Sequence, residues 1–472
     1  MKTIAVIITL IASTFAQGQD RVYSSSRTTN NKTTFNHSNG ISSFNVEMRG
    51  KIELADNDKD IKSMSADGYL EITKTVFGSK RSIVITPLGS GLKREYYEGR
   101  TQVAFEPEGR KWLSEIMLEL VRTTTIGAES RVNRFYKQGG SNSVLNEIRQ
   151  LESDHVKAHY ASLLMKLPVA VAEYGVITSS ISSTIESDHY ITEFLKDNID
   201  KFMQSKDATE ALFAATRKMD SDHYKTEVIK EALTSAPASL ENIKIIMQAT
   251  SNMDSDHYKT EVLTALLKQN NLTDPIIAEM INATKNIDSD HYRSVVLNKA
   301  LAKQGLSATS YQRAIESIKD IDSDHYKAEV LTNLLQKSIS AEALNNLIPM
   351  ISSIESDHYI TNVANEIVKR QNLSDESFQK LMEAVSGNGS DHYMSVFLQT
   401  ALERPNLSKQ NILSVLNATA RIGSDHYITE VLTDAAYKIK AMNDASLKDA
   451  YRVAAKRIES ETYYGRVVRA IE

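Results

Sequence analysis

Nine copies of the tetrapeptide Ser-Asp-His-Tyr, the first with Val in place of Tyr, recur along this chain. They begin at Ser153, Ser187, Ser221, Ser255, Ser289, Ser323, Ser356, Ser390 and Ser424. Successive copies are 34 residues apart, except for one step of 33 residues after Ser323. A unit of this size cannot bury its own apolar face, so the period is typical of a stacked array in which each repeat is stabilised by its neighbours.

Each unit divides into two predicted helices with a short polar break between them. The motif opens the first helix, and apolar residues follow at helical spacing, so we expect the motif tyrosine on the stripe that faces the core. The second helix begins at a Ser or Thr whose hydroxyl can accept a hydrogen bond from a first-turn amide: Ser205, Ser239, Thr273, Ser307, Ser340, Ser374 and Ser408. The pattern predicts a mostly α fold, a right-handed α-α solenoid of about ten 34-residue two-helix repeats over residues 153–472, with a C-terminal cap.

The segments before the repeats follow other patterns. Residues 1–16 combine a lysine, a short apolar run and then small residues, which is typical of a secretory signal peptide. Residues 17–43 are rich in Ser, Thr and Asn, so we expect a flexible leader. Residues 44–124 alternate in short runs and end in an amphipathic segment around Trp112, which predicts a small antiparallel β-domain with a covering helix. Residues 125–152 are expected to be a helical connector.

Cysteine is absent and the charge is nearly balanced. Without cysteine, an exported chain has no disulfide, no zinc–thiolate site and no thiol chemistry. The formal net charge is −5, with 55 basic and 60 acidic residues, which does not provide the basic face that nucleic-acid binding requires. We therefore expect a periplasmic or extracellular protein that binds no nucleic acid and has no membrane span in its mature chain.

The motif lies where a helix begins, and most of its residues suit that position. If Asp288 is the N-cap of one such helix, Ile287 and Tyr292 form a hydrophobic staple. The histidine is not required by this logic, and we expect it to be neutral and to link to the Asp or the backbone of the adjacent repeat. The predicted inter-repeat ladder comprises Asp188, His189, Asp222, His223, Asp256, His257, Asp290, His291, Asp324, His325, Asp357, His358, Asp391, His392, Asp425 and His426.

A metal site is the alternative interpretation of these residues. Asp and His are common ligands, and Glu follows the motif histidine by four residues in five copies: Glu193, Glu227, Glu261, Glu329 and Glu430. Stacked helices are about 8 to 10 Å apart, so one ion cannot join equivalent histidines of successive repeats. The candidate metal pair is His155 and His159, although the glutamate that follows the first histidine of a zinc-peptidase helix is missing.

Motifs for catalysis and for nucleotide binding are missing from the sequence. It contains no HExxH, no G-x-S-x-G and no phosphate-binding G-x-x-x-x-G-K-[ST]. We therefore expect no enzyme activity, no catalytic residue and no cofactor. The repeated tyrosines could form a row that stacks on carbohydrate, but their place on the apolar stripe favours core packing.

Three segments carry a resemblance to a known family: DNDKDIKSMSADGYLEI, LKREYYEG and IGAESRVNRFYKQGGSNSVLNEIRQLESDHVKAHY. Together they span roughly residues 46–160, and this part resembles the extracytoplasmic, non-peptidase region of bacterial relatives of the beta-lactam-sensing antirepressor metallopeptidases. In those chains, too, a β-region leads into helical repeats that open with a Ser-Asp-Tyr type of motif. The resemblance implies no catalytic role, because the HExxH helix is missing here. In layout the repeats also resemble HEAT and armadillo arrays.

These features together predict an exported, non-enzymatic bacterial scaffold that binds a protein or peptide partner on the surface of the solenoid. Two alternatives remain open. One is a metal-binding or metal-dependent protein that uses the Asp-His-(Glu) groups, and the other is a structural spacer at the cell surface.

The metal hypothesis has a direct test. From the repeat spacing we expect elemental analysis of the purified protein to find no bound ion, and we expect a chelator to leave the melting temperature unchanged. A stoichiometric metal content, or a melting temperature that falls when the chelator is added, would contradict this expectation.

Overall fold

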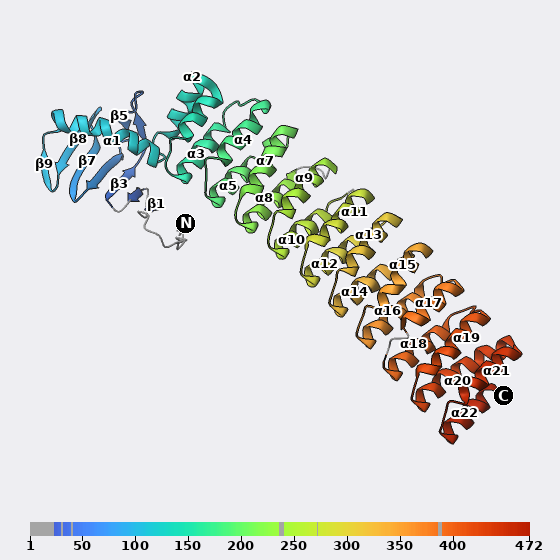
Figure 1. The fold of residues 1–472 in the computed structure, drawn as a ribbon. Coiled ribbons are helices and arrows are strands. Elements are labelled where there is room, and N and C mark those ends of the chain that lie inside the picture. Colours follow the sequence, from blue (N-terminus) through green and yellow to red (C-terminus); the bar gives the residue numbers. More distant parts are fainter. Residues whose placement is uncertain (1–22, 30–31, 39–40, 236–239, 271, 386–388) are drawn as a thin grey trace. The chain divides into compact units, whose positions relative to one another are not determined.

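The computed structural model describes residues 23–29, 32–38, 41–235, 240–270, 272–385 and 389–472. The predicted signal peptide, residues 1–16, lies outside these ranges. The chain forms two compact units, residues 1–235 and 236–472. In the described residues, the first unit contains a β-sheet followed by helices, and the second unit contains helices alone (Figure 1).

The first unit begins with an antiparallel sheet of seven strands in the order β1-β2-β3-β6-β7-β8-β9, beside a two-stranded β4-β5 sheet. The strands are β1 (Tyr23–Thr29), β2 (Lys32–Ser38), β3 (Ser42–Arg49), β4 (Ile52–Leu54), β5 (Ile61–Met64), β6 (Tyr69–Val76), β7 (Ser79–Leu88), β8 (Gly91–Glu98) and β9 (Thr101–Val103). The sheet begins earlier than expected, because β1 and β2 lie in the segment predicted as a flexible leader. The pairing of β2 with β3 explains this difference: Phe35 lies opposite Val46, and both side chains are buried.

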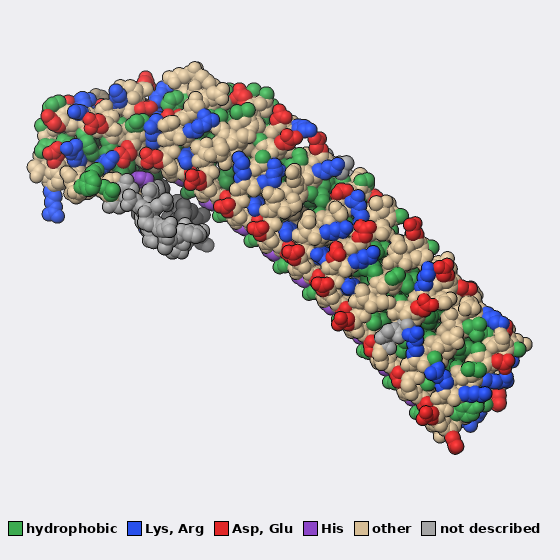
Figure 2. Space-filling model, viewed as in Figure 1, with side chains coloured by type: hydrophobic (Ala, Val, Ile, Leu, Met, Phe, Trp, Pro, Cys, Tyr) green, Lys and Arg blue, Asp and Glu red, His purple; other side chains and the backbone are tan. Residues whose placement is uncertain are grey.

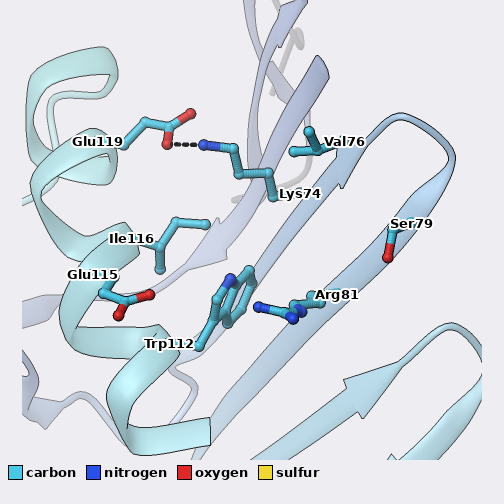
Figure 3. A pocket seen from close by; sticks show the side chains of 8 residues that line it. All are labelled: Lys74, Val76, Ser79, Arg81, Trp112, Glu115, Ile116 and Glu119. Atoms are coloured by element: carbon cyan, nitrogen blue, oxygen red, sulfur yellow. Dashed lines mark hydrogen bonds and ion pairs between the residues drawn. The ribbon is translucent and has the colours of Figure 1, made fainter. Parts of the chain in front are cut away.

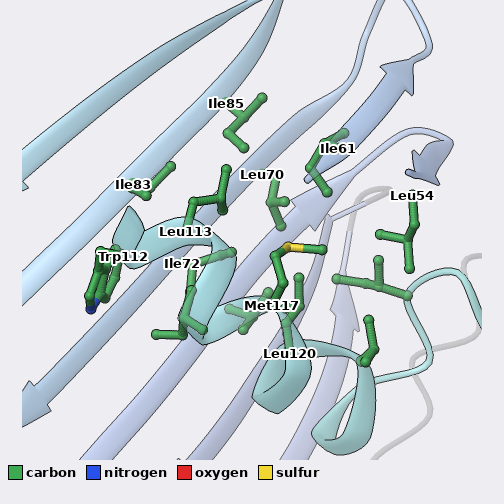
Figure 4. Close-up of a cluster of buried hydrophobic side chains, with 14 of the residues drawn as sticks. Leu54, Ile61, Leu70, Ile72, Ile83, Ile85, Trp112, Leu113, Met117 and Leu120 are labelled. Carbon is green, nitrogen blue, oxygen red and sulfur yellow. The ribbon is translucent and has the colours of Figure 1, made fainter. Parts of the chain in front are cut away.

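Helix α1 (Arg110–Thr123) covers one face of this sheet. Figure 4 shows Leu113, Met117 and Leu120 of α1 among the branched side chains of β6 and β7. Met117 and Leu120 are fully buried, and the Trp112 ring lies 5.8 Å from the ring of Tyr96 on β8. The apolar stripe of α1 therefore supplies the cover that a single sheet needs for stability.

Helix α2 (Ala128–Ile148) connects the sheet to the repeats and contains a kink. Gly139 and Gly140 leave helical geometry, and Gly140 adopts φ 64° and ψ −156°, a conformation that is open to glycine and strained for other residues. Arg131 of α2 is 1% exposed. Its guanidinium donates hydrogen bonds to Asp58 (3.0 Å), Glu147 (2.8 Å) and the Tyr160 hydroxyl (2.6 Å), and so joins the β-region, α2 and α3.

The remaining helices of the first unit are packed in two layers. They are α3 (Asp154–Leu164), a 3₁₀ turn (Val171–Glu173), α4 (Tyr174–Ser182), α5 (Asp188–Asp197), α6 (Ile199–Phe202), α7 (Lys206–Lys218) and α8 (Asp222–Ser235). The motif helices α3, α5 and α8 pack side by side, while α4 packs on α7.

The second unit repeats this arrangement. Its motif helices are α10 (Asp256–Leu267), α12 (Asp290–Leu301), α14 (Asp324–Leu335), α16 (Asp357–Arg370), α18 (Asp391–Glu403), α20 (Asp425–Met442) and α22 (Glu461–Ile471). Its second helices are α9 (Leu240–Ser251), α11 (Asp274–Ala283), α13 (Ala308–Lys319), α15 (Ala341–Ile351), α17 (Asp375–Val385), α19 (Lys409–Ala418) and α21 (Ala445–Ala455). Each set packs helix against helix in chain order, which gives two layers (Figure 1).

The predicted starts of the second helices are largely confirmed. A side-chain oxygen accepts a hydrogen bond from the amide three residues later, at 3.1 to 3.3 Å, at Ser205, Ser307, Ser340, Ser374 and Ser408. Thr273 is the N-cap of α11 but makes no such bond, and Ser239 lies outside the described residues. At α21 the cap is Asp444, which accepts from the amide of Leu447 at 3.0 Å.

Replacing Arg131 with Met should strongly destabilise the first unit. The change removes the buried cation that lies between Asp58 and Glu147 and leaves them only the more exposed Arg134 and Arg122, and breaking a buried pair typically costs about 3 to 5 kcal/mol. Thermal unfolding followed by circular dichroism measures the effect. The control is Arg110→Met, because Arg110 and its partner Glu106 are both more than half exposed, and such pairs contribute about 0 to 1 kcal/mol. Equal shifts for the two variants would contradict the role of Arg131.

Candidate functional site

The motif aspartates bind the start of the following repeat. The carboxylate of Asp290 accepts hydrogen bonds from the backbone amides of Asp322 (3.1 Å) and Ser323 (2.7 Å), which directly precede the next motif helix. The same contact, to one or two amides, is made in the first unit by Asp154 and Asp188, and in the second by Asp256, Asp324, Asp357, Asp391 and Asp425. We call these eight residues the aspartate ladder.

This ladder differs from the capping arrangement that we expected. Helix α12 begins at Asp290, so Ser289 and not Asp288 is its N-cap. The N-cap serine side chains make no capping bond at α3, α5, α10, α12, α14, α16, α18 or α20. The serine contributes its backbone amide instead, which points to the aspartate of the preceding repeat. A charged acceptor binds such amides more strongly than a hydroxyl does, which favours the inter-repeat contact.

A basic residue that the sequence reasoning missed supports several of these aspartates. The ammonium groups of Lys157, Lys225 and Lys259 lie 2.9 to 3.1 Å from the aspartate three residues earlier. Lys157 and Lys259 also donate to the backbone carbonyls of Thr184 and Asn286, at 3.0 and 2.8 Å, three residues before the next motif serine. In the sequence, these lysines stand out only as basic residues on the otherwise apolar face of the motif helix.

The motif histidines and tyrosines form rows of alternating rings. The motif histidines from His189 to His426 each lie 5.0 to 5.3 Å, between ring centroids, from the tyrosine of their own motif. His155, His189 and the six from His257 to His426 lie 5.5 to 6.2 Å from the tyrosine of the following repeat. We call this the histidine–tyrosine row; it runs from His155 to Tyr224 in the first unit and from Tyr258 to Tyr463 in the second.

The motif tyrosines are half-buried, so the prediction that they pack in the core is wrong. Their rings lie between imidazoles, while residues such as Val262 and Leu263 fill the core further along the helix. The histidines after His155 are exposed, and about half of the His257 side chain is accessible to solvent. In Figure 2 the histidines form a purple line along one edge of the helices in each unit.

Polar groups lie beside the row. The Nε2 atoms of His189, His257 and His426 are 3.5 to 3.7 Å from the glutamate four residues later. Glu227 instead receives a hydrogen bond from Lys196 at 2.8 Å, and Glu329 one from Asn298 at 2.9 Å. His325 Nδ1 is 3.0 Å from the hydroxyl of Tyr359 in the following repeat. The row therefore presents imidazole nitrogens and carboxylates next to aromatic surface.

The first and last copies of the motif show which motif residues contact the following repeat and which contact the preceding one. The first copy keeps Asp154 and His155, which contact the following repeat, and has the buried Val156 in place of tyrosine. The decayed copy at α22 keeps Ser460 and Tyr463, which contact the preceding repeat. Its Asp and His positions are replaced by Glu and Thr. Each copy thus retains the residues for which it has a neighbouring partner.

The candidate metal pair lies on α3. His155 is half-buried, and burial lowers its pKa; partial desolvation, followed by the nearby charges of His155 and Lys166, lowers the pKa of His159. Both shifts favour the neutral imidazole near pH 7. Within the described ranges, no three or more His, Asp or Glu side chains are grouped so that they could hold a metal ion.

A shallow pocket of about 440 Å³ lies between α1 and the β6–β7 hairpin (Figure 3). Trp112 and Ile116 form its apolar side, and Lys74 is bonded to Glu119 at 2.5 Å across it. The lysine is therefore neutralised in place, and Arg81 and Glu115 add one charge of each sign. The pocket has no net charge with which to select an ionic ligand.

Comparison with known proteins adds no family: no family model and no curated protein matches the chain. The structure itself defines a mostly helical protein, in which successive packed helices follow an antiparallel sheet. None of the helices in the described ranges combines the length and the apolar character needed to cross a membrane.

Replacing Asp290 with Ala should loosen the contact between two repeats. The backbone amides of Asp322 and Ser323 lose a charged acceptor, and such bonds contribute about 1.5 to 3 kcal/mol. Hydrogen–deuterium exchange should show faster exchange at these two amides, together with a lower melting temperature. Asp322→Ala removes the same charge from an exposed neighbouring side chain and is the control. Unchanged exchange in the Asp290 variant would contradict the ladder.

Proposed function

We propose that this protein is an exported, non-enzymatic repeat scaffold that binds an extended protein or peptide segment along the histidine–tyrosine row. The observation that supports this proposal is the continuity of the row, in which thirteen rings follow one another from Tyr258 to Tyr463. The expected export rests on the N-terminal sequence pattern, and the expected α-α solenoid is supported by the two helical layers in each unit. Its right-handedness stays a prediction.

The chemistry of the row suits a polypeptide. Tyrosine offers rigid apolar surface with a polar tip, so little conformational entropy is lost when it is covered. Each exposed imidazole has one donor and one acceptor nitrogen when neutral, which match the carbonyl and N–H groups of a peptide backbone. The carboxylates beside His189, His257 and His426 would select basic or amide side chains.

The spacing also suits an extended chain. Stacked helices are about 8 to 10 Å apart, and an extended polypeptide advances about 3.3 Å per residue. One repeat therefore corresponds to about three residues of ligand. Equivalent groups at this step can each contact the backbone of a bound segment once in about every three residues.

A structural spacer remains the second candidate, and the aspartate ladder favours it. Each ladder contact ties a helix start to its predecessor with hydrogen bonds to a charged group, which resists bending between repeats. A spacer needs this stiffness but has no use for exposed aromatic rings. The two candidates are therefore separated by changing the row alone.

Substitutions of the exposed histidines in the row should weaken partner binding and leave the fold intact. The triple variant His257→Ser, His291→Ser and His325→Ser removes three exposed rings, so we expect it to keep its fold and to lose at least about tenfold in affinity for the natural partner. The partner is first recovered by affinity capture from the exported fraction, and its dissociation constant is then measured by calorimetry.

The matched control for this variant alters exposed residues just beyond the C-terminal ends of the same three helices. Lys268→Ser, Gln304→Ser and Gln336→Ser should leave the affinity unchanged. If the histidine variant binds the partner as tightly as the unaltered protein does, the proposed role of the row fails and the spacer function is favoured.

A further inference from the structure

An open groove of about 500 Å³ lies between α13 and α15 of the second unit, beside α14. Two lysines, three amide side chains and a small apolar patch line it: Gln312, Lys319, Lys327, Asn345, Asn346, Pro349, Met350 and Ser353. No acidic side chain is part of this lining in the described structure. In contrast to the pocket under α1, the groove therefore carries uncompensated positive charge.

Lys327 occupies the position of the ladder-supporting lysines but lacks their contacts. Lys259 binds both Asp256 and a backbone carbonyl, whereas the Lys327 ammonium makes only a 3.4 Å contact with the Ser353 hydroxyl. Lys327 is 6% exposed, and no described carboxylate forms an ion pair with it. A buried ammonium without a counter-charge is costly, so an incoming anion is strongly favoured there.

This difference occurs in the single short repeat. The 33-residue step runs from Ser323 to Ser356, and Lys327 and α15 both lie within it. In the 34-residue repeats the carbonyl of Thr184 or Asn286, three residues before the next motif, receives the lysine. In the short repeat the equivalent residue is Ser353, and it offers a hydroxyl at a longer distance.

The rest of the lining suits a peptide backbone. Gln312 and Asn346 share one hydrogen bond of 3.1 Å, which leaves each amide with a further donor or acceptor. Pro349 lies inside α15 and has no N–H, so the carbonyl of Asn345 does not receive its helical hydrogen bond. Lys319 is exposed at the edge of the groove and has no described ion-pair partner.

We propose that this groove binds an acidic side chain of an extended peptide, with the carboxylate on Lys327 and Lys319 and the peptide backbone on the amides and on the carbonyl of Asn345. The carboxylate preference follows from the groove alone. The peptide nature of the ligand rests on the proposed function, which it deepens by naming a side chain that the partner carries.

Calorimetric titration of the full chain tests the proposal with defined peptides. The probes are (Ser-Glu)₅ and (Ser-Gln)₅, both with blocked termini, and sodium acetate. We expect (Ser-Glu)₅ to bind at least about tenfold more tightly than (Ser-Gln)₅, because a carboxylate forms stronger hydrogen bonds to an ammonium than a neutral amide does. Equal affinity for the two peptides overturns the carboxylate site. Acetate that binds as tightly as (Ser-Glu)₅ overturns the peptide assignment.

Single substitutions in the groove test whether (Ser-Glu)₅ binds there. Lys327→Met should weaken (Ser-Glu)₅ at least about tenfold, while Lys268→Met, which removes the same charge from an exposed site, should change affinity less than about twofold. Asn346→Asp places a carboxylate on the exposed rim and should also weaken binding, which decides the matter if Lys327→Met does not fold. Unchanged affinity in a folded Lys327→Met, or in Asn346→Asp, overturns the site.

The histidine triple variant separates this proposal from the proposed function. It should bind (Ser-Glu)₅ normally, because none of its three histidines lines the groove. Loss of (Ser-Glu)₅ binding in that variant assigns the peptide to the row and overturns the groove. Loss of the natural partner in the histidine variant, together with normal (Ser-Glu)₅ binding in Lys327→Met, overturns the groove and leaves the proposed function standing.

Discussion

The contact on which the repeats depend is the hydrogen bond from a motif aspartate to the backbone amides that precede the next motif helix. The carboxylate of Asp290, at the start of α12, accepts a hydrogen bond from the backbone amide of Ser323, which directly precedes α14. The amides before a helix have no partner within that helix, so the ladder satisfies them with a charged acceptor from the neighbouring repeat. The apolar layers give each unit its stability, and the ladder sets the register in which those layers stack.

Two of the four motif residues contact the following repeat, and the other two contact the preceding repeat. Asp and His contact the next repeat, while the serine amide and the tyrosine ring contact the previous one. The first copy keeps the forward-reaching Asp154 and His155 and has Val156 in place of the tyrosine, while the last copy keeps Ser460 and Tyr463 and has lost the Asp and His. This directionality accounts for the histidine, which helix capping alone does not explain: its ring bridges two tyrosines and holds them at the surface.

The single 33-residue repeat makes one part of the repeat surface differ from the rest. In the short repeat the Lys327 ammonium contacts the Ser353 hydroxyl, whereas Lys259 contacts a carboxylate and a carbonyl, and two lysines line a groove in a chain whose net charge is negative. The uniform row and the single groove are complementary. A row of equivalent stations can hold an extended segment, whereas a unique charged position can fix its register.

Much of the fold could be read from the spacing of the motif. The 34-residue period, the helix starts at Ser205 or Ser340 and the amphipathic pattern of α1 depend on local chemistry, and local chemistry is written in consecutive residues. The motif Asp and His were predicted to link neighbouring repeats, but the bonding of Asp290 to Ser323, the packing of the histidines on half-buried tyrosines and the strand at Phe35 were not predicted. Those features depend on which groups meet across residues far apart in the chain. The repeating unit and the caps of its second helices follow from the order of residues along the chain. The exposure of the motif histidines and the half-burial of the motif tyrosines follow from packing between repeats, because exposure is a property of neighbours in space.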